Sequence, residues 1–294
     1  MALKTDAERF RKSMLLGAAG LRTSKIVSWV VIAAGALVFL VPLYVMVVMA
    51  FKHPNEISTT SPWAWPKEFT SDNFREVLST PNVDFRLLFK NSLFIAVMST
   101  TGVLLSSAVF AYPFARLNFR GKDRLFILLL STMMLPGIVT TIPTYLVFKY
   151  LHWVDTFYPL WVPAWLGGGA FNIFLLRQFF MAIPRELDEA AVLDGASNAR
   201  IFWGIIMPNS GPALATVGIF AFIYNWRDFM GPLIYLNAPD KQTLEVGLNY
   251  FKGLNNLEWG KLMAASVLVM APLVIMFILG QRYFVKGIVM TGGK

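Results

Sequence analysis

The sequence has 294 residues, of which 56% are hydrophobic and 15% are charged, against roughly 25% charged in an ordinary soluble domain. This composition excludes an ordinary soluble globular protein and indicates a membrane protein. The net charge is +9 and cysteine is absent, which excludes a disulfide framework, a thiolate metal site and a cysteine nucleophile.

Six apolar segments are long enough, or nearly so, to cross a bilayer, which takes about 20 residues. The six segments are 26–50, 91–115, 125–148, 156–176, 211–236 and 262–281. The first follows a basic tail, residues 1–25, and no persuasive cleavage site follows it, so we expect a retained signal-anchor helix. The sequence therefore predicts an all-α integral membrane protein with six transmembrane helices.

The charged residues orient these helices. With the N-terminus inside, the predicted inner segments hold 16 basic and 7 acidic residues, whereas the outer segments hold 9 of each. Lysine and arginine gather on the cytoplasmic side of membrane proteins, so we expect both termini in the cytoplasm. The basic tail is interpreted as a topology anchor, with contact to membrane lipid headgroups as the alternative. Topology explains the positive charge, and no nucleic-acid partner is expected.

Helix-breaking residues interrupt the third and fourth spans, which follow an expected periplasmic loop at 51–86. Pro136-Gly137 predicts a kink in the third span, with Thr140 and Thr144 near it. Broken membrane helices occur where the backbone lines a cavity, so these threonines are candidates for the substrate pathway; irregular packing is the alternative. Three glycines, 167–169, predict a bend in the fourth span, and we hypothesise that this bend is a hinge.

Residues 184–208 form the one long polar, helix-patterned segment in the second half of the chain. Pro184 can occupy the first turn of a helix, and the three acidic residues that follow suit the positive end of the helix dipole. Gly195 can end this helix in a left-handed conformation, and Ser197 can cap a second short helix, 198–207. The pattern predicts a rigid elbow that fits a socket on another protein; a solvated connection between helices is the alternative.

The residues of this elbow resemble the EAA loop of permease subunits of binding-protein-dependent ABC importers. The positions that match are Glu189, Ala190, Ala191, Asp194, Gly195 and Ala196, followed by an aliphatic run that ends at Pro208. The resemblance covers roughly residues 87 to 290 and includes Thr243 to Leu248 and Gln281 to Gly287. These segments are similar to the carbohydrate-importer branch, and specifically to the smaller permease subunit of the maltose importer.

The resemblance implies a type I ABC importer permease fold in a bacterial inner membrane, with a cytoplasmic EAA coupling helix. The transmembrane core would span 87–285, and residues 286–294 would form a cytoplasmic tail. The implied partners are a second permease in a heterodimer, two ATPase subunits that bind ATP and Mg, and a periplasmic or lipid-anchored sugar-binding protein. The six matching residues would couple to the ATPase.

The chain itself shows no catalytic or metal-binding motif. It has no phosphate-binding loop of the G-x-x-x-x-G-K-[ST] type, so we expect a non-catalytic subunit without a cofactor of its own. Its two histidines, His53 and His152, lie far apart in sequence and offer no metal site.

Arg227 and Asp228 interrupt the fifth span. The carbohydrate branch usually has asparagine at the arginine position. The two residues are either an interfacial ion pair or pathway residues, in which case Arg227 favours an acidic sugar because its guanidinium binds carboxylates bidentately. The branch implies an oligosaccharide, and this arginine suggests an acidic uronate-type chain such as alginate.

Two further expectations concern the outer loop and the energy source. By resemblance, Asn249, Tyr250 and Phe251 are candidates for docking of the binding protein. The competing function is an ion-gradient-driven secondary transporter, for which Asp228 is the only carboxylate inside a predicted span.

Overall fold

The computed structural model describes residues 27–80, 83–252 and 258–292. The described chain is helical and contains no strand. Its main helices are Val27–Ala50, α2 (Pro54–Thr59), α3 (Asp72–Ser79), α4 (Phe85–Arg116), α5 (Lys122–Ser131), α6 (Gly137–Tyr150), α7 (Tyr158–Trp165), α8 (Ala170–Ala182), α9 (Glu186–Leu193), α10 (Asn198–Ile201), α11 (Met207–Asn209), α12 (Gly211–Trp226), α13 (Met230–Tyr235), α14 (Leu244–Gly247) and α15 (Trp259–Gly292). Shorter 3-10 and π-helical turns are η1 (Thr132–Met134), η2 (Phe202–Ile206), η3 (Pro239–Lys241) and η4 (Leu248–Lys252).

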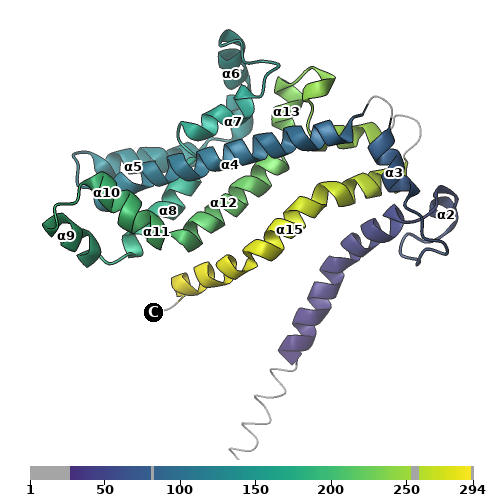
Figure 1. The fold of residues 1–294 in the computed structure, drawn as a ribbon, viewed down its shortest axis with the longest axis horizontal. Helices are drawn as coiled ribbons and strands as arrows, with labels where there is room; N and C mark the ends of the chain where they lie inside the picture. Colours follow the sequence, from purple (N-terminus) through teal and green to yellow (C-terminus); the bar gives the residue numbers. More distant parts are fainter. Residues whose placement is uncertain (1–26, 81–82, 253–257, 293–294) are drawn as a thin grey trace, which may run out of the picture.

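The long helix α4 is the axis of the molecule, and α7, α8 and α12 pack along it (Figure 1). Asp84 starts α4 by accepting the backbone N–H groups of Arg86 and Leu87, both at 3.1 Å. The 32 residues of α4 rise about 48 Å, which exceeds the roughly 30 Å of a bilayer core. Its buried face carries glycine, serine and alanine, and such small residues let neighbouring membrane helices approach closely.

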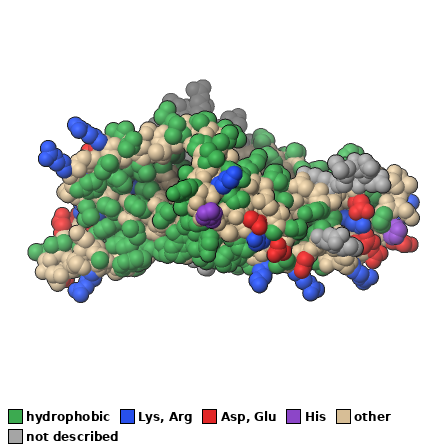
Figure 2. All heavy atoms as spheres, turned by 90° about the horizontal axis from the view of Figure 1, so that it is seen from above, with side chains coloured by type: hydrophobic (Ala, Val, Ile, Leu, Met, Phe, Trp, Pro, Cys, Tyr) green, Lys and Arg blue, Asp and Glu red, His purple; other side chains and the backbone are tan. Residues whose placement is uncertain are grey.

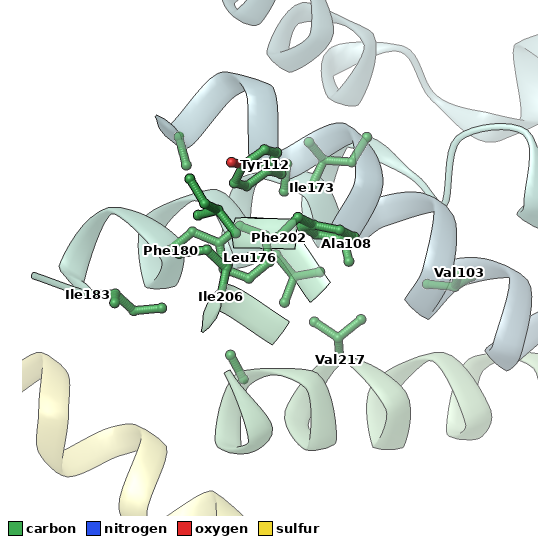
Figure 3. Packing of buried hydrophobic residues seen from close by; sticks show 14 of the residues in the cluster. Val103, Ala108, Tyr112, Ile173, Leu176, Phe180, Ile183, Phe202, Ile206 and Val217 are labelled. Carbon is green, nitrogen blue, oxygen red and sulfur yellow. The ribbon is translucent and has the colours of Figure 1, made fainter. Parts of the chain in front are cut away.

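Two hydrophobic clusters occupy opposite ends of α4. The cluster at the end of α4 near Arg116 combines side chains from α4, α8, η2 and α12, with Phe180, Phe202 and Ile206 among them (Figure 3). The other combines α3, α4, α12, α14 and α15 around Trp226, whose indole N–H donates to the Val269 carbonyl at 3.0 Å. Apolar packing in the first cluster therefore holds the end of α4 near Arg116 against the segment that follows α8.

The number of candidate spans reaches the predicted six only if each of two bent helix pairs counts as one span. The second pair joins Asn198–Asn209 to Gly211–Trp226 and so begins inside the predicted elbow. Four described helices are long and apolar enough to cross a bilayer alone. In the predicted span 125–148, α5 with η1 meets α6 at a bend of 99°, which is much sharper than a kink. Leu135 and Pro136 both have extended backbone there. Proline has no N–H to continue the helix and disfavours helical backbone in the residue before it.

The predicted span 211–236 is not one continuous helix, because α12 ends at Trp226 and α13 begins at Met230. The 16 residues of α12 rise only about 24 Å, so α12 alone falls short of the bilayer core. The Asp228 carboxylate stabilises the interruption by accepting the Gly231 N–H at 3.0 Å.

Of the three glycines between α7 and α8, Gly168 lies directly against α4. Gly168 has φ +60°, and a Cβ at this position would lie 2.7 Å from the Ser106 Oγ, 2.8 Å from the Val103 carbonyl and against Ser107. Glycine is therefore required at position 168 because the backbone there lies so close to α4, whether or not this segment moves as a hinge.

Much of the surface is apolar. Figure 2 shows hydrophobic side chains over most of one face, with charged side chains concentrated toward the two ends. The helix Val27–Ala50 stands apart from the other helices (Figure 1), and none of its most apolar stretch is buried by the residues that the structure describes. On α6, Ile138 and Ile142 are each 72% exposed. Such a surface must be covered by lipid or by another protein.

Candidate functional site

The first half of the elbow, residues 184–208, is a helix closed by a glycine corner. The α9 helix begins at Glu186, so Pro184 precedes the first turn instead of occupying it as predicted. Gly195 has φ +75°, its N–H donates to the Val192 carbonyl at 3.0 Å, and the Ala196 N–H donates to the Ala191 carbonyl at 2.8 Å. These two bonds form a Schellman motif, which satisfies carbonyl groups at the helix end and requires a left-handed residue.

The second half of the elbow is one irregular helical segment instead of the regular helix predicted at 198–207. Ser197 caps α10 by accepting the Arg200 N–H at 3.4 Å. The π-helical turn η2 follows and buries Phe202 and Ile206 in the cluster shown in Figure 3. The chain then bends by 78° into α12. The second half is therefore anchored by apolar packing.

The six predicted coupling residues divide into an exposed group and an inward group. Glu189, Ala190, Asp194 and Gly195 are exposed, whereas Ala191 and Ala196 are partly buried against the hydrophobic cluster. The structure thus places the alanine pair on the inner side of the corner and leaves the other four residues accessible to a partner.

Sequence reasoning missed two apolar residues at the tip of α9. Val192 is 59% exposed and Leu193 is 89% exposed, and both line a surface groove of about 500 Å³ with Arg116, Asp188 and Glu189. No local pattern marks these two residues, because the face of α9 that turns inward is set by its packing. Exposed apolar side chains beside carboxylates suit a protein partner.

Sequence reasoning also missed Arg116, the last residue of α4. Its Nη2 donates to the Ile183 carbonyl at 2.7 Å, and its Nη1 lies 3.4 Å from Oδ2 of Asp188 in α9. The arginine side chain is 3% exposed and the aspartate side chain 19%. A buried charge needs such a partner, and no local sequence pattern joins these distant positions.

The predicted pathway residues do not form one cluster. Within the described residues, no ion pair joins Arg227 and Asp228, so the predicted interfacial pair is wrong. Arg227 is exposed, and Asp228 bonds to the backbone of α13. On α6, the exposed Thr140 donates to the Gly137 carbonyl of its own helix at 2.9 Å, and Thr144 is half-buried. In the part of the chain that the structure describes, no ion pair or hydrogen bond connects either threonine with Arg227 or Asp228.

One of the three predicted docking residues is wrong. Phe251 is 4% exposed and belongs to the cluster around Trp226, because the turn η4 packs against α15. Asn249 and Tyr250 are exposed, with Tyr250 at 54%. The adjoining residues 253–257 lie outside the described chain.

An unpredicted aspartate connects two loops on the side of α4 from which α6 and α13 project (Figure 1). Asp155 Oδ1 accepts the N–H groups of Asn237 and Ala238, both at 3.0 Å, and Oδ2 accepts from Lys241 Nζ at 2.9 Å. The Ala238 N–H, then the Lys241 ammonium and the Asn237 N–H, lower the pKa of Asp155 to about 2. The carboxylate therefore stays ionised near neutral pH and holds the loops together.

Comparison with known proteins adds independent evidence. The model of the family described as binding-protein-dependent transport system inner membrane component matches residues 99–290. The chain is 33% identical over 260 residues to the probable ABC transporter permease protein YurM of Bacillus subtilis, which covers 88% of this chain and 85% of that protein. It is 34% identical over 255 residues to the trehalose/maltose transport system permease protein MalG of Thermococcus litoralis, covering 86% and 91%.

A solved structure shows that the fold has been seen before. The crystal structure of a bacterial ABC transporter involved in the import of the acidic polysaccharide alginate contains a chain with a TM-score of 0.79 to this one. The two are 24% identical, and the match covers 90% of this chain and 97% of that chain. The overall helix arrangement is therefore shared.

Proposed function

The chain belongs to the family of binding-protein-dependent transport system inner membrane components, and on that basis we propose that its elbow is the site at which separate ATPase subunits drive transport. Permeases of this family are non-catalytic subunits of ATP-driven importers. The observation that carries the proposal is the rigid Schellman corner beside the exposed tip of α9. An element that transmits movement from a partner protein needs both a fixed shape and a surface that the partner can contact.

The proposed assembly contains this chain, a second permease, two ATPase subunits that bind ATP and Mg, and a periplasmic or lipid-anchored binding protein. The excess of basic residues in the predicted inner segments supports a cytoplasmic location for the elbow and both termini. The unpartnered apolar surface of α6 supports contact with a second permease. On the opposite side of the membrane, the exposed Asn249 and Tyr250 are the candidates for contact with the binding protein.

In this assembly, ATP closes the ATPase pair and moves the two elbows, one from each permease. The exposed side chains of Val192 and Leu193 would enter a groove on the ATPase, while Glu189 and Asp194 make polar contacts at its rim. The helices joined to the elbow would then open the pathway toward a loaded binding protein.

The proposed function is tested by measuring which energy source drives uptake. We expect ATPase subunits to co-purify with the chain, and uptake into vesicles to require ATP and to persist after proton and sodium gradients are collapsed. The competing secondary transporter predicts the reverse. It is disfavoured because Asp228, the one carboxylate within a predicted span, is bonded to the Gly231 N–H. Gradient-driven uptake by the chain without an ATPase would overturn the proposal.

The proposed cargo is a carbohydrate, and specifically an oligosaccharide with acidic, uronate-type units. Relatives of this chain include a trehalose/maltose permease protein and an arabinooligosaccharide permease protein, which supports a sugar. The exposed guanidinium of Arg227, which forms no ion pair within the described chain, supports a negative charge on that sugar.

Replacing Arg227 with asparagine should reduce uptake of a uronate oligosaccharide about tenfold or more. A charge-assisted hydrogen bond contributes about 1.5–3 kcal/mol, and this substitution removes the charge. Uptake of a neutral oligosaccharide of the same length should stay within about twofold. Lys149→Asn, an exposed basic residue at the end of α6, is the matched control. Equal losses for acidic and neutral sugars would contradict the assignment of an acidic cargo.

A further inference from the structure

One arginine side chain joins three elements near the elbow. Arg116 ends α4, and its guanidinium bonds to the carbonyl of Ile183, just after α8, at 2.7 Å. The same guanidinium lies 3.4 Å from the carboxylate of Asp188 in α9. The contact is shielded from solvent, since the arginine side chain is 3% exposed. Arg116 therefore connects the end of α4 to the end of α8 and to the first half of the elbow.

The two halves of the elbow are attached in different ways. The second half buries Ile201, Phe202 and Ile206 in the hydrophobic cluster. By contrast, α9 contains no buried residue, and Ala191 packs only partly against that cluster. Among the described residues, Arg116–Asp188 is the one ion pair that includes a residue of the elbow. The orientation of α9 relative to α4 thus depends mainly on this pair.

We infer that Arg116 is a positioning residue that makes α4 follow the movement of α9. This inference rests on the proposed function, in which the ATPase pulls on the elbow. Separating Arg116 from Asp188 would leave a buried charge without its partner, which is strongly unfavourable. The two side chains therefore stay together, and a movement of α9 is transmitted to α4. Because α4 packs against α7, α8 and α12, a displacement of its end reaches the helices that form the core.

Part of the hydrogen-bonding capacity of the pair is unused in this conformation. Nε and Nη1 of Arg116 and Oδ1 of Asp188 are buried and form no hydrogen bond in this conformation. Buried polar atoms are normally satisfied. The unused donors and acceptor can form further bonds across the same contact while α9 and α4 keep their relative position.

The test uses the complete complex of both permeases, the ATPase pair and the binding protein, reconstituted in vesicles. Arg116→Gln and Asp188→Asn should each lower the amount of sugar transported per ATP hydrolysed about tenfold, with ATP hydrolysis within about twofold of the unmodified complex. The double variant should be no worse than either single variant, because both remove the same interaction. Arg120→Gln, an exposed basic residue after α4, should leave the yield unchanged. An unchanged transport yield in the single variants would overturn the inference.

Two additional variants separate positioning from simple destabilisation. Arg116→Lys keeps the positive charge and should restore part of the transport yield. Asp188→Asn leaves the hydrogen bond from Arg116 to the Ile183 carbonyl in place. It therefore still tests the inference if Arg116→Gln prevents assembly of the complex. If the unmodified chain assembles with no ATPase, the proposed function fails. If the unmodified complex transports and both single variants keep its ATP yield, only this inference fails.

A distance measurement reports the coupling directly. The chain has no cysteine, so spin labels can be attached at Asn118→Cys and Glu186→Cys, two exposed positions at the end of α4 and the start of α9. In the complex, a non-hydrolysable ATP analogue should leave this distance unchanged, because the two helices move together. With Arg116→Gln present, the same analogue should shift the distance. The same response with and without Arg116 would contradict the inference.

Discussion

Replacing Gly195 with leucine is expected to reduce uptake at least tenfold while the protein still inserts and assembles. The corner residue has φ +75°, and a side chain there costs about 1–2 kcal/mol because L-residues avoid this conformation. Among the described residues, no atom lies within 4 Å of a Cβ added at Gly195, so the side chain would not collide with its own chain there. The side chain would instead project from the elbow toward the proposed ATPase socket. Transport and ATP hydrolysis measured on the same reconstituted complex should therefore become uncoupled.

Two matched variants identify the cause of this effect. Gly204→Leu adds the same side chain elsewhere in the elbow, where φ is not positive and nothing lies within 4 Å, and it should be milder. Gly195→Asn introduces a residue that tolerates the left-handed conformation, and it should retain more transport than leucine. Normal uptake with Gly195→Leu would show that this corner is not part of the coupling site.

Replacing Gly168 is expected to destabilise the fold before it affects transport. If the glycine run were a hinge, Gly168→Leu would impair transport more than folding. The contacts of Gly168 predict the opposite. A Cβ at Gly168 would collide with Ser107 and crowd Ser106 and Val103 of α4. Overpacking of this kind costs about 1–3 kcal/mol, in addition to about 1–2 kcal/mol for the left-handed backbone.

The neighbouring glycine provides the control. Gly167 has no positive φ, and no atom of the described chain lies within 4 Å of an added Cβ, so Gly167→Ala should leave the thermal midpoint nearly unchanged. Gly168→Ala should lower that midpoint by several degrees, since 1 kcal/mol corresponds to about 2–4 °C for a domain of 150–250 residues. Fluorescence-detected size-exclusion after heating measures both. Full stability combined with impaired transport in Gly168→Ala would restore the hinge interpretation.

The elbow shows how much of a site can be predicted from local sequence. Gly195 as a left-handed helix end and Ser197 as a helix cap follow from properties of single residues and their neighbours, and both are present in the structure. The division between the inward Ala191 and the exposed tip at Leu193 was not predicted. That division depends on which face of α9 turns toward α4, and the pattern of an eight-residue helix does not determine it.

The apolar stretches and breakers of this sequence predicted that the protein is helical, that it has several segments apolar enough to cross a membrane, and that the third and fifth of these segments are interrupted. These properties follow from hydrophobicity, proline geometry and charge, which act over a few residues. The tertiary structure alone decided that Phe251 points inward, that Gly168 touches α4 and that Arg116 bonds to the loop after α8. Arg116 and its partner Ile183 are 67 positions apart, and such a contact depends on how whole helices pack, which no local preference encodes.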